Sequence, residues 1–227
     1  MRTKLALKEK LFRLATKYRN KNTHPQIRLP DSISPIDANT LFSGNGSEKR
    51  ILELGAGWGE FCVEWMKSHP DHSYVAFEIK WDRIKQIIKQ TEIFQLAQLR
   101  IVPINFNWFL EEILPQRAFD RVIINFPDPW PKKRHWKHRL VNSHFPDRIK
   151  KILRENGTVF LATDYGPYAR KILSTFRNRD DFEPVYPWPH YSRFAPADHP
   201  KTRFETIHLN DGRSPYYQEW RLISGKS

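Results

Sequence analysis

The chain of 227 residues contains a single cysteine, Cys62, and therefore no CxxC pair. One thiol excludes an internal disulfide framework and a cysteine zinc site. It is typical of a reducing compartment, so we expect a cytoplasmic protein. No apolar run approaches the roughly 18 residues that a bilayer-spanning helix needs, and no membrane partner is expected. His135, His138 and His144 lie close together without a cysteine or carboxylate cluster at metal spacing, so no metal site is predicted.

Acidic residues are scarce relative to basic ones. The 25 Asp and Glu stand against 38 Lys and Arg, which gives a formal net charge of +13 and a sequence pI near 9.9. This excess predicts an acidic partner, with nucleic acid favoured over a membrane surface. Hydrophobic residues make up 39% of the chain, which indicates a folded globular protein, and one domain is the default at this length.

The first 22 residues form the most basic end of the chain. They carry eight Lys or Arg against one acid, Glu9, and leucines recur at helical spacing. We therefore expect this end to be a cationic arm that clamps RNA, and we assign residues 1–49 to a basic N-terminal extension and residues 50–227 to the main folded domain. A transit peptide and a frayed terminus are the alternatives for this end.

From residue 50 onward, short apolar runs alternate with amphipathic stretches. Strands are expected at 50–54, 73–78, 99–104, 122–126 and 157–163, with another within 214–223, and helices at 60–68, 81–94 and 143–154. This alternation predicts an α/β fold with a doubly wound, mostly parallel sheet and helices on both faces. Residues 184–200 contain five prolines and are expected to form a long surface excursion.

A glycine-rich segment, Glu53-Leu-Gly-Ala-Gly-Trp-Gly59, joins the first expected strand to the first helix. Glycine allows a sharp turn and the close approach of a ligand, so Gly55 and Gly57 are candidate cofactor contacts. The spacing is GxGxG and differs from the GxGxxG of pyrophosphate sites. A tight turn without a ligand is the alternative.

Polar residues follow the first three expected strands. Glu78 ends the second strand, 19 residues beyond Gly59, where a carboxylate can accept hydrogen bonds from both ribose hydroxyls of an adenosine cofactor. Asn105, after the third strand, is placed to contact an adenine edge. Glu53 can meet a cationic group of the cofactor or, alternatively, cap the nearby helix. Together these features favour S-adenosylmethionine over NAD.

Residues 125–139 are the most informative stretch: Asn-Phe-Pro-Asp-Pro-Trp-Pro-Lys-Lys-Arg-His-Trp-Lys-His-Arg. Three prolines lack amide donors and fix their own φ angles, so a strand must end and a stiff loop begin. Asp128 stands between prolines at the carboxyl end of a buried strand and is the candidate catalytic residue. The cations behind it suit nucleic-acid phosphates, and a solvated basic loop is the alternative for them.

With these motifs in order, the chain resembles the bacterial tRNA (guanine-N7-)-methyltransferase family over about residues 50–206. Phe126-Pro-Asp-Pro-Trp-Pro-Lys-Lys-Arg-His135 is the most specific element, and Ala162-Thr-Asp164 and Thr202-Arg-Phe-Glu205 also match. The resemblance implies a Rossmann-like class I methyltransferase fold with S-adenosyl-L-methionine as cofactor. It further implies methyl transfer to N7 of a guanine in the variable loop of tRNA.

The resemblance also implies roles for individual residues. Cofactor contacts are implied for Glu53, Glu78, Asn105 and Asp128. Substrate contacts are implied for Lys132, Asp164, Thr202, Arg203, Phe204 and Glu205, and RNA contacts for Lys133, Arg134, His135, Lys137 and Arg139. The chain departs from the family at Asn105, where Asp is usual, and at Trp136 and His138, where charged or small polar residues are commoner.

Guanine N7 carries a lone pair and no proton, so the chemistry needs no general base. We expect Asp128 to accept hydrogen bonds from guanine N1 and N2 and to stabilise the cationic product, with Asp164 as a second acceptor. One alternative is a class I methyltransferase with a different acceptor, and another is a non-catalytic RNA-binding protein that retains the fold. The sequence requires no protein partner, so a monomer or homodimer is expected.

Overall fold

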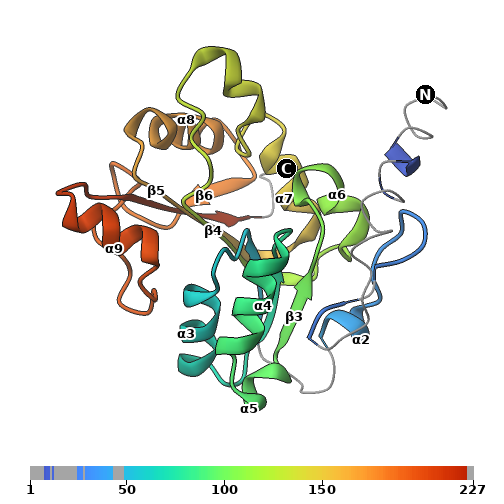
Figure 1. Ribbon diagram of the computed structural model, residues 1–227. Helices are drawn as coiled ribbons and strands as arrows, with labels where there is room; N and C mark the ends of the chain where they lie inside the picture. Colours follow the sequence, from blue (N-terminus) through green and yellow to red (C-terminus); the bar gives the residue numbers. More distant parts are fainter. Residues whose placement is uncertain (1–7, 11, 13–24, 28, 43–48, 224–227) are drawn as a thin grey trace.

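A seven-stranded sheet lies at the centre of the protein, as a computed structural model of residues 8–10, 12, 25–27, 29–42 and 49–223 shows (Figure 1). The strands are β1 (Arg50–Leu54), β2 (Ser73–Phe77), β3 (Leu99–Val102), β4 (Phe119–Asn125), β5 (Leu153–Thr163), β6 (Phe182–Pro184) and β7 (Tyr216–Leu222). Their order is β3-β2-β1-β4-β5-β7-β6; β7 runs antiparallel to both β5 and β6, and the other pairs are parallel. The predicted doubly wound, mostly parallel sheet is confirmed.

Helices pack on both faces of this sheet (Figure 1). The helices of the described ranges are α2 (Ala38–Leu41), α3 (Glu60–Ser68), α4 (Trp81–Gln90), α5 (Ile93–Leu96), α6 (Phe106–Ile113), the 3₁₀ helix η1 (Lys133–His138), α7 (Phe145–Ile152), α8 (Gly166–Arg177) and α9 (Arg203–Asn210). Apolar side chains of α3 and α4 join the core on one face, and those of α6, α7 and α8 join it on the other. Each of these helices is too short or too polar to cross a bilayer.

Two hydrophobic clusters, one on each face, account for the apolar runs in the strands. In β1, Leu52 and Leu54 face the cluster under α6, α7 and α8, while Ile51 faces the cluster under α3. All five residues of β2 are buried. A central strand covered on both faces needs apolar side chains at successive positions, which is the pattern that the sequence shows.

The described part of residues 1–49 packs into the same core. Two backbone hydrogen bonds of 2.9 Å join it to Ile101 on the edge strand β3, and Gln26 forms a parallel bridge there. Phe12 and Leu41 are buried in the cluster under α6 and α7. The predicted boundary at residue 49 therefore does not coincide with a boundary of the core. Most of the predicted basic stretch lies outside the described residues.

Some predicted element boundaries are wrong. The strand predicted at 157–163 begins at Leu153, and α7 stops one residue before it. Leu153 pairs with Phe119, and the register then shifts before the pairing resumes at Thr158. Asn156 has a φ of 62°, which belongs to an irregularity that the apolar pattern does not signal.

Among the described helices of eight or more residues, three have no counterpart in the predicted pattern: α6, α8 and α9. Each begins at a local signal that the apolar pattern does not include: the Asn105 side chain caps α6, a proline stands in the first turn of α8, and Thr202 caps α9. The helix predicted over 81–94 is divided, because α4 ends at Gln90 and α5 is a separate turn.

The predicted excursion, residues 184–200, runs beside β7. Ser192 forms an antiparallel bridge with Tyr217, and Val185 donates a backbone hydrogen bond to a carbonyl of β7. His199 lies buried near its end, with its ring 4.7 Å from that of Phe61. The excursion thus contributes to the core on the α3 face.

Candidate functional site

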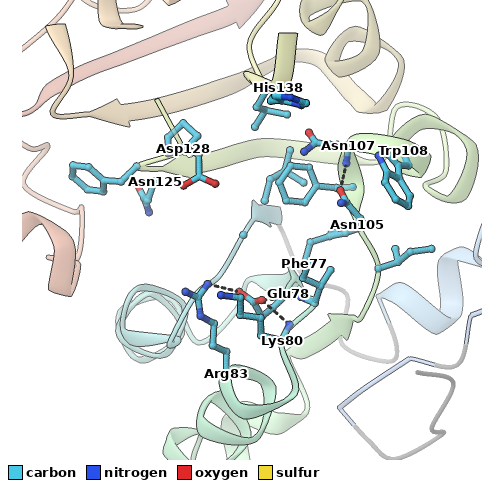
Figure 2. Close-up of a pocket in the computed structure, with 18 of the residues that line it drawn as sticks. Phe77, Glu78, Lys80, Arg83, Asn105, Asn107, Trp108, Asn125, Asp128 and His138 are labelled. Atoms are coloured by element: carbon cyan, nitrogen blue, oxygen red, sulfur yellow. Dashed lines mark hydrogen bonds and ion pairs between the residues drawn. The ribbon is translucent and has the colours of Figure 1, made fainter. Parts of the chain in front are cut away.

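A cavity of about 570 Å³ opens at the carboxyl ends of β1, β2 and β4. The strand order reverses between β1 and β4, and ligands of open α/β sheets bind in the crevice at such a point. Glu78 follows β2, Asn105 precedes α6 and Asp128 follows β4, and all three line this cavity. Figure 2 shows their side chains on different sides of it, with the Asp128 carboxylate pointing into the space.

A smaller cavity of about 150 Å³ adjoins the first and is lined in part by the glycine-rich segment. Gly55, Asn125 and Asp128 line both cavities. The smaller one also reaches Glu53 within the buried part of β1 and Arg203 at the start of α9. The fold therefore brings the glycine segment, the Asp128 loop and the α9 motif together at one place.

The glycine-rich turn after β1 needs glycine for two different reasons. Gly57 has a φ of 60° and an added Cβ would meet no atom within 4 Å, so its backbone conformation alone favours glycine. Gly59 has a φ of 90°, and a Cβ there would lie 2.6 Å from Cγ1 of Ile87. The close approach of α3 to α4 thus depends on Gly59.

Glu78 is held rigidly at the rim of the larger cavity. Its Oε1 accepts hydrogen bonds from the backbone N–H groups of Ile79 and Lys80, both at 2.8 Å. Its Oε2 accepts from Gly57 N–H at 3.0 Å and from Nη1 of Arg83 at 3.4 Å. The glycine turn and this carboxylate therefore form one preorganised unit, and the ribose contact of Glu78 stays a prediction.

Glu53 is buried in the wall of the smaller cavity, with 1% of its surface exposed. Burial raises the pKa of this carboxyl to about 7, and a 2.9 Å hydrogen bond from the Tyr74 hydroxyl opposes that shift. Gly59 begins α3 without a side-chain cap, so the alternative role of Glu53 as a helix cap is not observed. A cation placed beside Glu53 would favour its ionised form.

Asn105 has a structural task as well as a place in the cavity wall. Its Oδ1 accepts a hydrogen bond from Asn107 N–H at 3.0 Å and so caps α6. The cap uses one of the two lone pairs of this oxygen, so the second lone pair and the side-chain nitrogen are what Asn105 can offer a cofactor.

The loop that carries Asp128 is bracketed by two residues with unusual backbones. Phe126 has a φ of 51° and Trp130 a φ of 40°, a region that bulky residues seldom adopt. Such conformations persist where surrounding contacts impose them, and they are common at functional sites. Asp128 is exposed at the turn between them.

The predicted RNA-binding residues form η1 and its flanks. Lys132, Lys133, Arg134 and Lys137 are exposed, and His135 is half-buried, with its ring 5.6 Å from that of Trp130. Arg139 differs from them, because only 5% of it is exposed and its guanidinium points into the protein. The basic run therefore divides into exposed cations and one internal one.

The Thr202–Glu205 motif forms the first turn of α9. Thr202 Oγ1 accepts from Glu205 N–H at 3.0 Å, and Glu205 Oε2 accepts from Thr202 N–H at 3.4 Å, which is a capping box. Glu205 is fully buried and also accepts a 2.7 Å hydrogen bond from the Tyr217 hydroxyl. Thr202 and Arg203 line the smaller cavity, while the side chain of Phe204 lies outside the described part of the chain.

Two other predicted residues lie apart from the cavity linings. Asp164, just after β5, is 3.3 Å from Nη1 of Arg213. Lys132 stands exposed between the Asp128 loop and η1. Neither is among the residues that line the two cavities.

Two functional candidates escaped the sequence analysis. Asn125 ends β4 and lines both cavities, and its amide lies beside the buried Glu53 carboxyl, where it helps to oppose the rise in that group's pKa. Arg83 lines both cavities from α4. A polar residue at the end of an apolar strand is a signal that could have singled out Asn125. In the described ranges, no three His, Cys, Asp or Glu side chains are grouped to hold a metal.

Comparison with known proteins places the chain in a family. A family model described as "Putative methyltransferase" matches residues 47–216. The tRNA (guanine-N(7)-)-methyltransferase of Leptospira interrogans (strain Fiocruz L1-130) is 42% identical over 191 residues, which cover 84% of this chain and 86% of that protein. The chain belongs to the tRNA (guanine-N(7)-)-methyltransferase family. Its counterpart in Nitrosomonas europaea is 32% identical over 199 residues, 88% of this chain and 87% of that one.

Solved structures agree on the fold of this family member. The aminoglycoside resistance methyltransferase NpmB1 matches with a TM-score of 0.56 at 14% identity, over 86% of this chain and 98% of that one. An SAM-dependent O-methyltransferase from Thermotoga maritima matches with a TM-score of 0.51 at 14% identity, over 84% and 64%. The Rossmann-like methyltransferase fold predicted from the sequence is confirmed.

Proposed function

We propose that this protein transfers a methyl group from S-adenosylmethionine to N7 of a guanine in the variable loop of tRNA. The observation that carries the proposal is the position of Asp128. Its carboxylate stands where the two cavities meet, directly before the exposed cations of η1. Membership of the family supports the same reaction and the same acceptor.

The residues around the two cavities fit S-adenosylmethionine. The larger cavity offers a fixed carboxylate, Glu78, for ribose hydroxyls and Asn105 for the adenine edge. The smaller one offers Glu53 for the cofactor's ammonium group and Arg203 for its carboxylate. Asn125 lines both cavities beside the Glu53 carboxyl and offers its amide to a polar ligand there.

When bound here, S-adenosylmethionine supplies the electrophilic methyl group. The chain has to align guanine N7 with that group, and alignment contributes up to about 7–11 kcal/mol in favourable cases. Asp128 accepts the N1 and N2 protons of the guanine as hydrogen bonds and stabilises the positive charge that develops on the ring. No side chain has to remove a proton, because N7 carries none.

The exposed cations of η1 position the RNA. Lys133, Arg134 and Lys137 suit backbone phosphates, while Lys132 lies nearest to Asp128 in the chain. Trp136 is 45% exposed beside them and can stack on a base, a contact worth about 1–3 kcal/mol. Extracting the guanine from folded tRNA costs a few kcal/mol, and these contacts offset that cost.

Labelled S-adenosylmethionine and unmodified tRNA test the proposal, with the product nucleoside identified by mass spectrometry. We expect 7-methylguanosine at one guanine of the variable loop. Label in another nucleoside, or in protein and not in tRNA, would show a methyltransferase with a different acceptor. Salt-sensitive tRNA binding without any methyl transfer would show an RNA-binding protein that retains the fold.

A further inference from the structure

Arg139 occupies a different place from the cations that precede it in the chain. Its residue surface is 5% exposed, whereas Lys133, Arg134 and Lys137 are exposed around it. Its guanidinium lies between two aromatic rings, 4.7 Å from the centre of Trp136 and 5.0 Å from that of Tyr168. A group enclosed in this way is not presented to a phosphate.

The contacts of Arg139 are with the backbone of the Asp128 loop. Its Nε donates to the carbonyl of Pro129 at 2.7 Å, and its Nη2 donates to the carbonyl of Trp130 at 3.3 Å. The planar fork of a guanidinium can bond two adjacent carbonyls while its faces stack on aromatic rings. A lysine ammonium in the same place lacks that fork.

The loop needs donors from outside because it has few of its own. Pro127, Pro129 and Pro131 lack backbone N–H groups. Phe126 and Trp130 hold left-handed backbones, which cost about 1–3 kcal/mol each and persist only where neighbouring contacts impose them. Buried carbonyls without a partner cost further free energy.

Tyr168 packs its ring against the Arg139 guanidinium. It is fully buried on α8, and its hydroxyl accepts a 3.0 Å hydrogen bond from the N–H of Val141. Burial raises the pKa of Tyr168 to about 12, so the ring stays neutral beneath the guanidinium. The loop, η1 and α8 are thus joined at Arg139.

We propose that Arg139 is a positioning residue, which fixes the Pro129 and Trp130 carbonyls and thereby holds the Asp128 carboxylate where the two cavities meet. It does not serve as a phosphate ligand. This inference rests on the proposed function of Asp128 and replaces the RNA contact that the sequence implied for Arg139.

The test compares Arg139→Lys, which keeps the charge and loses the fork, with Lys137→Ala, which removes an exposed cation. For each variant we would measure turnover, the Kd of S-adenosylhomocysteine by calorimetry, and the Kd of tRNA across salt concentrations. Arg139→Lys should lower turnover by about 10- to 100-fold, because small displacements at a reacting centre are costly. It should also raise the Kd of S-adenosylhomocysteine. Its tRNA affinity and salt slope should match the wild type, whereas Lys137→Ala should reduce the slope by about one.

The opposite pattern would overturn the inference: Arg139→Lys with normal turnover and normal ligand affinity, or Arg139→Ala with a salt slope reduced as in Lys137→Ala. Tyr168→Phe provides a milder variant that keeps the ring and loses the hydroxyl. It should lower turnover without changing the salt slope, and an unchanged turnover would count against the arrangement. If the wild type methylates no tRNA, the proposed function fails, while S-adenosylhomocysteine affinity still tests whether Arg139 positions the loop.

Discussion

The backbone N–H of Gly57 donates a 3.0 Å hydrogen bond to the carboxylate of Glu78, so the turn after β1 and the acid after β2 form one unit. Two motifs that lie 21 residues apart in the chain thus shape one wall of the site. The wall is set before any ligand arrives, which limits the ordering that binding requires.

Glu78→Gln should weaken cofactor binding. Hydrogen bonds to a charged group contribute about 1.5–3 kcal/mol, so the Kd of S-adenosylhomocysteine should rise about 10- to 150-fold. Calorimetry checks this, with Asp82→Asn as control because that acid is exposed on α4 and lines neither cavity. A Kd within twofold of the wild type would remove Glu78 from the ribose site.

Glu53 should make the protein less stable as the pH rises. Its folded pKa is raised to about 7, above the ordinary value of 4.5. Its contribution to stability is therefore full below about pH 4.5 and is lost as the pH rises through 7. The free energy of unfolding, measured in urea, should fall less between pH 5 and pH 8 in Glu53→Gln than in the wild type. An equal fall in the variant and the wild type would contradict the assignment.

His199 should have the opposite effect and make the protein less stable as the pH falls. Its ring packs against Phe61 and Phe160, and both ring nitrogens lack a hydrogen-bond partner among the described residues. Burial lowers its pKa from 6.5 to about 3, so its contribution is present above pH 6.5 and is lost as the pH falls toward 3.

His199→Phe removes that dependence and replaces an unpaired polar ring with an apolar one of similar shape. The variant should therefore be more stable than the wild type at pH 5, by about 1–2 kcal/mol, with a smaller difference at pH 8. Thermal unfolding at the two pH values is the measurement. A variant that is less stable at pH 5 would show that the His199 nitrogens are satisfied.

Gly59→Ala should destabilise the fold. The added Cβ would meet Cγ1 of Ile87 at 2.6 Å in a backbone with a φ of 90°, so a loss of about 2–4 kcal/mol is expected. Gly212→Ala is the matched control, because its φ is 70° and an added Cβ meets no atom within 4 Å. Urea midpoints that fall equally in the two variants would show that α3 and α4 can separate without cost.

The sheet could be predicted from the sequence because its central strands are covered on both faces. Apolar runs such as residues 122–124 and 74–77 report that burial directly. The helices α6, α8 and α9 could not be found in the same way. They begin at capping residues such as Asn105 and Thr202, and a cap is a local hydrogen bond that does not show in the spacing of apolar residues.

The sequence motifs predicted well which residues lie at the site, but they predicted less well what each of those residues does there. Asp128, Glu78 and the glycine turn lie together, as predicted. Glu205, however, is buried in a capping box, and Arg139 is buried against the backbone of the Asp128 loop. A charged residue in a binding motif can serve the fold instead of the ligand. Only the three-dimensional packing separates these two cases.

The central claim is that Asp128 acts on the guanine during methyl transfer, and the rate of a single turnover with saturating tRNA and S-adenosylmethionine tests it most directly. Asp128→Asn keeps the size of the side chain and removes its charge. We predict a rate lower by about 10²- to 10³-fold, with the Kd of S-adenosylhomocysteine changed far less. Asp147→Asn, an exposed acid on α7, serves as control. A rate for Asp128→Asn close to that of the wild type would contradict the account.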